Sequence, residues 1–148
     1  MSYTERFTEQ YAILDEHDPR TRQVATHVSS WVSLANYHRA LLHLKVGDLG
    51  ALATLDAGIQ QASDSTGTGA KAITGKTITQ LTQAGGDGPN YDAVIELRTE
   101  ELDVTNGFEH VRFYVTIAVA DCTYAATLFG DTSRFKPVST SGYDEVVD

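Results

Sequence analysis

His110–Gly130 reads HVRFYVTIAVADCTYAATLFG, and its first half has a strict two-residue repeat. A strand points successive side chains to opposite faces, so such a repeat places its large apolar residues on one face of a sheet. A helix would spread the same residues around its circumference. The pattern therefore predicts a strand whose buried face carries the following residues: Val111, Phe113, Val115, Ile117 and Val119.

The second half of this stretch also has strand character. Thr123–Phe129 is rich in β-branched and aromatic residues, which favour strands. The intervening Ala120-Asp121-Cys122 is short enough to reverse the chain. We therefore predict that the two strands form the central hairpin of an all-β domain.

Further short strands are predicted on the N-terminal side of this hairpin. Their apolar residues recur with the same period of two, and turn-forming segments separate them. They are Val28–Leu34, Arg39–Val46, Thr54–Gln61, Ile73–Leu81 and Tyr91–Arg98. The connections expected between them include Ala62–Lys71, Ala84–Asn90 and Glu100–Phe108, the last with a turn at Asn106-Gly107. About seven or eight closely spaced antiparallel strands predict a jelly roll or β-sandwich.

The two ends of the chain differ from this pattern. Residues 1–22 are charged throughout, and we expect them to form an extended N-terminal arm outside the sheet. The spacing of Tyr3, Phe7, Tyr11 and Leu14 allows a short amphipathic helix there, ending before Pro19. Residues 23–138 form the predicted β-domain, and residues 139–148 form an acidic C-terminal tail.

Composition limits the classes of partner. The chain has 148 residues and a formal net charge of −9, from 20 acidic and 11 basic residues. This charge repels phosphate backbones, and the lysines form no cluster, so we expect no nucleic-acid partner. No apolar run approaches the roughly 20 residues of a membrane span, so no membrane partner is expected either. With a single cysteine, Cys122, the chain cannot form an internal disulfide, which fits synthesis in a reducing cytoplasm.

One segment resembles a phosphate-binding loop. Ala70–Thr77, AKAITGKT, satisfies the relaxed pattern with alanine in place of the first glycine. Such a loop needs a following helix whose N-terminal amides hold the phosphates. The residues that follow Lys76 are threonine-rich and strand-like, so we interpret the segment as part of a hairpin.

Other chemically active residues form no recognised motif. The five histidines, His17, His27, His38, His43 and His110, have no metal-ligand spacing. Acidic residues near positions 87–92 and 100–103 match no known calcium loop, and the pair Glu96 and Glu109 is too common an arrangement to indicate a glycosidase. We therefore predict no catalytic, cofactor-binding or metal-binding residues, and no enzymatic activity.

The overall pattern resembles that of the jelly-roll decoration, or cement, proteins of tailed bacteriophages. The likeness spans about Leu34–Val138. It rests on LANYHRALLHLKVGDLGALATLDAGIQQASDSTGTGAKAITGKTITQLTQAG and on VIELRTEELDVTNGFEHVRFYVTIAVA. Within these stretches, Arg39 stands at the start of a strand, and a linked pair of strands lies around Ala57 and Ile78. Phe108–Arg112, an aromatic residue followed by Val-Arg, leads into the next strand. A final strand ends near Gly130.

The resemblance implies a virion structural protein that binds the major capsid protein on the outer surface of the head and stabilises the shell. A homo-oligomer, either a dimer or a trimer, is expected. A head–tail joining or tail component is an alternative of the same class. A carbohydrate-binding β-sandwich is an alternative of another class, in which Trp31, Tyr37, Tyr91 and Tyr124 would stack on sugars.

Overall fold

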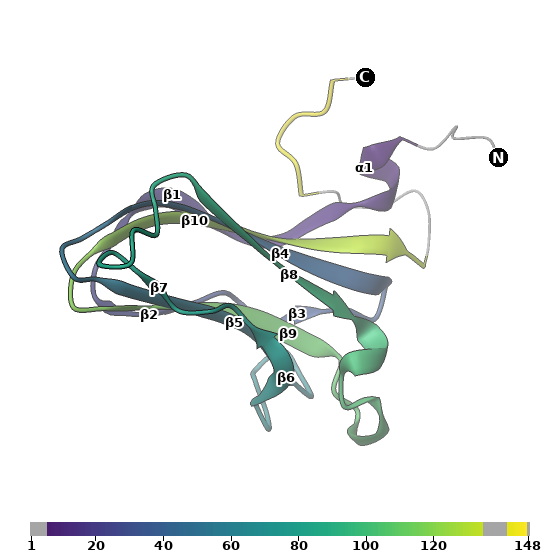
Figure 1. Cartoon of the computed structure of the whole chain (residues 1–148). Coiled ribbons are helices and arrows are strands. Elements are labelled where there is room, and N and C mark those ends of the chain that lie inside the picture. The colour runs from purple at the N-terminus through teal and green to yellow at the C-terminus, as the bar shows by residue number, and fades with distance from the viewer. Residues whose placement is uncertain (1–5, 135–141, 148) are drawn as a thin grey trace.

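The computed structural model describes residues 6–134 and 142–147, which form an all-β domain of two antiparallel sheets (Figure 1). A single four-residue α-helix, α1 (Phe7–Gln10), and two short 3₁₀ helices, η1 (Thr99–Glu101) and η2 (Val104–Asn106), accompany the strands. The strands are β1 (Ala12–Arg22), β2 (Ala25–Val28), β3 (Val32–Ser33), β4 (Tyr37–Leu49), β5 (Thr54–Ala62), β6 (Lys71–Thr77), β7 (Leu81–Thr82), β8 (Tyr91–Arg98), β9 (His110–Ala118) and β10 (Cys122–Ser133).

The strand order identifies the sandwich as a jelly roll. The four-stranded sheet has the order β1-β10-β4-β8, and the six-stranded sheet has the order β2-β9-β5-β6 with two-residue strands β3 and β7 at its margins. Along the chain, the eight longer strands change sheet at every connection except β5 to β6. This winding of two four-stranded layers is that of a double-sheet jelly roll. The fold class predicted from the sequence is therefore confirmed.

The core lies between the two sheets, where their apolar faces meet. Val111, Phe113, Val115 and Ile117 of β9 are each at most 1% exposed, as the two-residue repeat predicted. From the opposite sheet, alternate residues of β4 and β10 face them: Ala40, Leu42, Leu44, Val46, Cys122, Tyr124, Ala126 and Leu128. Val119 is the exception, because β9 ends at Ala118 and the Val119 side chain is 67% exposed.

The predicted central hairpin is wrong. β9 pairs with β2, β3 and β5, whereas β10 pairs with β1 and β4, so the two consecutive strands belong to opposite sheets. The turn at residues 119–121 carries the chain across the sandwich. Both strands have one apolar face, and these faces are buried against each other across the core instead of side by side in one sheet.

The expected N-terminal arm is also wrong for residues 12–22. These residues form β1, an edge strand that pairs with β10 from Ala12↔Gly130 to Arg22↔Cys122. The register of this pairing shifts between His17 and Arg20, and this interval contains Pro19, which has no amide to donate. Proline is tolerated in an edge strand at such an irregularity. Of residues 6–22, only 6–11, which include α1, lie outside the sheets, and Tyr3 is outside the described residues.

Two smaller differences from the prediction concern the strand at Val28–Leu34 and the C-terminal tail. The predicted strand Val28–Leu34 is divided into β2 and β3, because residues 29–31 leave the ladder. At the C-terminus, the described residues 142–147 begin beside the four-stranded sheet. A Cβ atom on Gly142 would lie 2.5 Å from the carbonyl oxygen of Ile13 in β1, so Gly142 lies directly on that strand, and the residues after it lead away from the sheet (Figure 1).

Candidate interaction sites

A groove of about 710 Å³ lies where α1 passes over the end of the four-stranded sheet. Apolar residues form much of its lining, and charged residues from five elements complete it. The apolar members are Phe7, Tyr11, Ala40, Leu41, Leu97 and Phe129, and the charged members are Arg39, Lys76, Glu96, Arg98, Glu101 and Asp131. The groove exists because the outward positions of β4 and β10 carry Leu41 and Phe129 where α1 covers them.

The charged residues of the groove are largely neutralised by one another. Arg39 forms an ion pair with Asp131 and donates to the Thr132 hydroxyl at 2.9 Å. The Lys76 ammonium contacts Glu101 Oε1 at 2.9 Å and donates to the Glu96 carbonyl oxygen at 2.8 Å. The amide of Arg98, with help from Lys76, lowers the pKa of Glu101. The groove therefore offers shape and apolar area more than a free charge or a general base.

α1 presents an aromatic pair at the mouth of this groove. The Phe7 and Tyr11 rings stack with centroids 4.0 Å apart and nearly parallel planes. Phe7 nevertheless remains 63% exposed. The helix is attached to the sheet through Gln10, whose Nε2 donates to Asp131 at 3.2 Å. An exposed aromatic ring held in place by a neighbour is suited to contact a second molecule.

A buried polar chain connects the two sheets near β1. Arg22 Nε donates to the Tyr124 hydroxyl at 3.1 Å, and His17 Nδ1 lies 2.9 Å from the same hydroxyl. His17 Nε2 lies 3.3 Å from the carbonyl oxygen of Val28 in β2. A carbonyl can only accept, so Nε2 carries the proton and Nδ1 accepts from Tyr124. Burial raises the pKa of Tyr124 to about 12, so the hydroxyl remains protonated.

The hydrogen-bonded group of Arg22, Tyr124 and His17 predicts how the stability of the folded protein depends on pH. Burial lowers the pKa of His17 below its ordinary value of 6.5, Arg22 and His27 lower it further, and Asp15 and the Val28 carbonyl oppose them. Below about pH 6.5 the unfolded chain therefore binds a proton that the folded protein resists, so stability should fall as pH decreases through this region. Urea unfolding at pH 7.5 and 5.5 measures this change.

A His17→Gln variant provides the comparison for this experiment. Glutamine retains a donor and an acceptor but does not titrate. Its stability should therefore change less than that of the parent between pH 7.5 and 5.5. Equal slopes for the two proteins would show that His17 does not control this part of the curve.

The phosphate-loop pattern has a structural role. Lys71–Thr77 is the edge strand β6, with no helix after it. Lys71 forms an ion pair with Asp103 at 2.5 Å, and Lys76 is bound to Glu101 and to the backbone of β8. Both lysines therefore tie the six-stranded sheet to the segment that follows β8. This geometry agrees with the structural interpretation of the motif.

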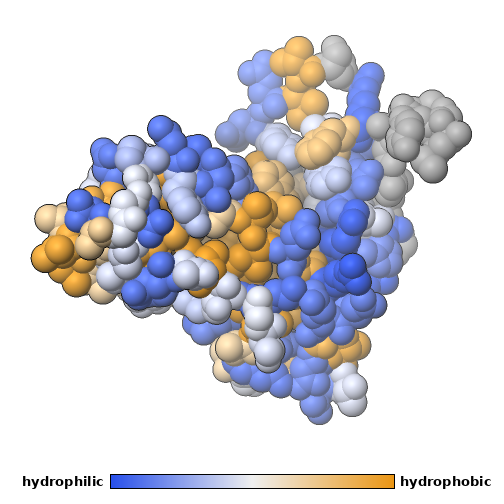
Figure 2. All heavy atoms as spheres, viewed as in Figure 1, coloured by the Kyte–Doolittle hydropathy of each residue, from blue (hydrophilic) through white to orange (hydrophobic). Residues whose placement is uncertain are grey.

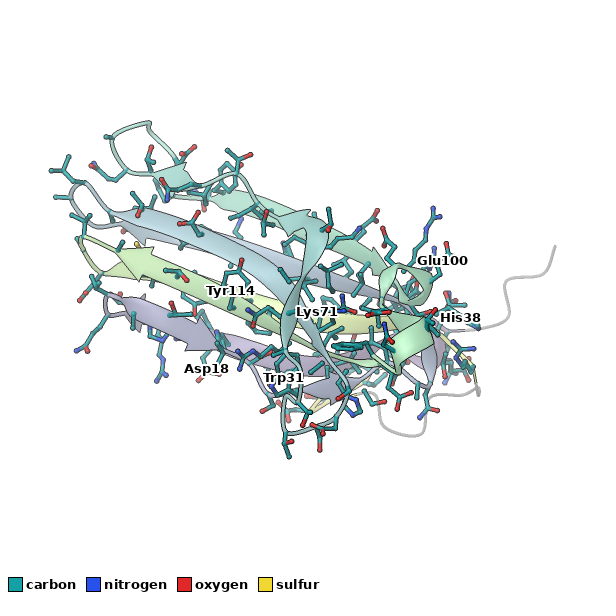
Figure 3. The ribbon with its side chains drawn as sticks, turned by 90° about the horizontal axis from the view of Figure 1, so that it is seen from below. Asp18, Trp31, His38, Lys71, Glu100 and Tyr114 are labelled. Atoms are coloured by element: carbon teal, nitrogen blue, oxygen red, sulfur yellow. The ribbon has the colours of Figure 1, made fainter. Side chains whose placement is uncertain are left out.

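The four aromatic residues of the carbohydrate-binding alternative do not form one surface. Tyr37 and Tyr124 are 9% and 1% exposed, so neither ring is available to a sugar. Trp31 covers the loop before β6: a Cβ on Gly67 would lie 2.4 Å from its Nε1, and Arg112 stacks 4.6 Å from its ring centroid (Figure 3). Only Tyr91 retains substantial exposure, at 37%.

The remaining sequence candidates are also dispersed. Among residues 6–134 and 142–147, no group of three His, Cys, Asp or Glu side chains is placed to hold a metal ion. His43 instead bonds to Asp92, and Asp64 accepts from Thr66 and Thr68, whose hydrogen bonds lower its pKa. Within the same described residues, no helix has the length and apolar character to cross a membrane.

The sequence patterns do not predict two exposed apolar residues in turns, Leu52 and Val119. Leu52 and Val119 are large apolar residues in turns, 66% and 67% exposed, and both have positive φ angles, +60° and +74°. Such angles are uncommon for leucine and strongly disfavoured for a β-branched valine. No sequence pattern indicates that Val119 is exposed, because it continues the apolar repeat of β9.

Comparisons with known proteins add little to this geometry. No family model matches the chain, and no curated protein matches its sequence. Among solved structures, it is similar to a chain in the "Structure of infectious bursal disease virus Gt strain", with a TM-score of 0.41 and 11% identity. The match covers 86% of this chain and 33% of that chain. A likeness at this level carries no information about function or partners.

Proposed function

We propose that the protein is a non-enzymatic structural component of a virus particle, namely a decoration protein of a tailed-phage head. In this role it binds the major capsid protein on the outer surface of the shell and stabilises the assembled particle. The observation that supports the proposal most is the eight-stranded jelly-roll winding. Domains of this type are found in viral capsids, although a fold alone does not determine a function.

Three further observations agree with the proposal. The space between the sheets is filled by apolar side chains that are each less than 10% exposed, which favours binding of a partner at the surface. Around the groove, Arg39 is paired with Asp131 and Lys76 is paired with Glu101. The net charge of −9 is unsuited to the DNA-filled interior of a head and suits its outer face. The carbohydrate alternative is weakened because Tyr37 and Tyr124 are buried.

Co-sedimentation with shells tests this function. Shells assembled from the major capsid protein of the same virus, without this protein, are mixed with the purified full-length chain and centrifuged. We expect saturable co-sedimentation and a higher disassembly temperature of the decorated shells, because a ligand that binds only the assembled state stabilises it. A full-length protein that never sediments with shells would refute the proposal. Binding without any change in disassembly temperature would refute the stabilising role.

A further inference from the structure

Three connections meet at the end of the sandwich opposite α1 and η2, and together they form a surface that we call the apolar tip. It comprises the β1–β2 turn with Val24, the β4–β5 turn with Leu52, and the β9–β10 turn with Val119. The register places them together, because Ala25 pairs with Ile117, Thr54 with Ala118 and Leu49 with Cys122. Figure 1 shows these turns converging at the left end of the molecule.

The side chains of the apolar tip are unusually exposed for their type. Val24 is 50% exposed, Leu52 is 66% exposed and Val119 is 67% exposed. By contrast, the core-facing residues at the adjoining strand ends are at most 1% exposed: Val46, Leu55, Ile117 and Cys122. Figure 2 shows apolar residues gathered at this end of the molecule. Single exposed apolar residues are ordinary, but three on separate turns at one end indicate a contact surface.

The turn at Val119 holds its side chain outward in a strained conformation. The amide of Ala120 donates to the carbonyl oxygen of Ala118 at 3.0 Å, and Val119 between them has a φ of +74°. This three-residue turn with positive φ is rare and strained, and glycine would adopt it more easily. A valine here raises the energy of the folded chain without burying its side chain. Strained residues of this kind are concentrated at functional sites.

The Leu52 turn is held by several hydrogen bonds to its neighbours. Gly50 donates to the Asp121 carbonyl oxygen at 2.9 Å, and Ala53 donates to the Gly50 carbonyl oxygen at 2.9 Å. The Leu52 amide donates to the Gln83 side chain at 3.1 Å. The tip is therefore fixed by backbone contacts rather than by packing of its own apolar side chains. A surface ordered before binding loses less conformational entropy when it binds.

We propose that the apolar tip is the part of this protein that inserts into the shell, in an apolar depression bordered by lysine or arginine side chains. The proposal rests on the function proposed above. The three turns contain no lysine or arginine, while Asp48 and Asp121 beside them are exposed. A basic border would complement these carboxylates. Contact between the tips of two copies would bring like charges together, and an anionic membrane would repel them, so a protein shell is the better partner.

Variants of the tip test this in the co-sedimentation assay. Leu52→Asp places a charge at the contact, and Val119→Gly removes the side chain while relieving the backbone. Each should weaken shell binding by about tenfold or more, as for residues central to an interface. Both should melt close to the parent protein, because neither side chain is packed in the core. Val104→Asp is the matched control, since Val104 is 63% exposed in η2 at the opposite end and should bind normally.

The possible outcomes separate the two proposals. If the parent does not bind shells, both the proposed function and the role of the tip are refuted. If the parent binds and the tip variants bind equally well, only the role of the tip is refuted. Parent protein that dimerises in solution through Leu52, or that floats with phosphatidylcholine vesicles unless Leu52 is changed, would also overturn it. Selective loss of shell binding in both tip variants, with normal binding by Val104→Asp, supports it.

Discussion

Deletion of residues 2–22 is expected to abolish folding, whereas deletion of residues 2–10 should leave the sandwich intact. The longer deletion removes β1, which covers one edge of β10 along nearly its whole length. It also removes His17 and Arg22, and so leaves the buried hydroxyl of Tyr124 without the partners described above. An unsatisfied buried polar group costs about 1–3 kcal/mol by itself. The free energy of unfolding of a typical domain is only about 5–15 kcal/mol. We expect the free energy lost with a whole strand to exceed it.

The shorter deletion is the control for this experiment. It removes α1, none of whose residues is buried, and retains every strand. Near-ultraviolet circular dichroism and thermal melting distinguish the two variants, since both report fixed packing of the aromatic core. A cooperative transition near the parent melting temperature for the protein without residues 2–22 would contradict the role of β1. Loss of folding in the protein without residues 2–10 would show that α1 is needed as well.

Ile117→Asp should be the most damaging single substitution in β9. Ile117 is 1% exposed between the two sheets, and a carboxylate there has neither water nor a partner. We expect a loss of about 4 kcal/mol or more, which is the range reached only by a buried unpaired charge or a comparable defect. Urea unfolding followed by tryptophan fluorescence measures the difference.

Thr116→Lys is the matched control, one residue away on the other face of the same strand. The Thr116 hydroxyl lies 3.0 Å from that of Thr26 on the outer surface of the six-stranded sheet. Losing this exposed hydrogen bond should cost only about 1 kcal/mol. If the two substitutions were equally destabilising, the outer face of β9 would have to be buried, for example in an oligomer.

The contrast between Ile117 and Thr116 shows which part of the fold can be predicted from the sequence. Alternation along β9 identified the buried face correctly, because burial depends on the local period of two. Alternation does not specify which strand lies alongside. For that reason the sequence pattern predicts a hairpin turn at Ala120-Asp121-Cys122, although the chain crosses between the sheets there. The pairing of β10 with β1 joins residues 100 or more positions apart, about which the local pattern carries no information.

β1 was missed for a different reason. Its sequence, AILDEHDPRTR, lacks alternation because most of its residues remain at least partly exposed, and Pro19 argues against a central strand. It is held by pairing with β10 on one side and by contacts that show no local pattern, such as the bond of His17 to Val28. The apolar tip was missed because backbone strain has no signature in composition. Val119 in particular has the residue type and spacing of a core residue, and only the end of β9 at Ala118 exposes it.

The position of β10 in the middle of the four-stranded sheet has a consequence for synthesis on the ribosome. β10 is the last strand among the described residues, yet it lies between β1 and β4, which are made earlier. β1 and β4 cannot join into one sheet until β10 has emerged from the ribosome. The nascent protein must therefore keep the facing edges of both strands unpaired until then, and unpaired edges are prone to aggregate. Such non-local pairing is also slow, so this sheet should take milliseconds to seconds to form.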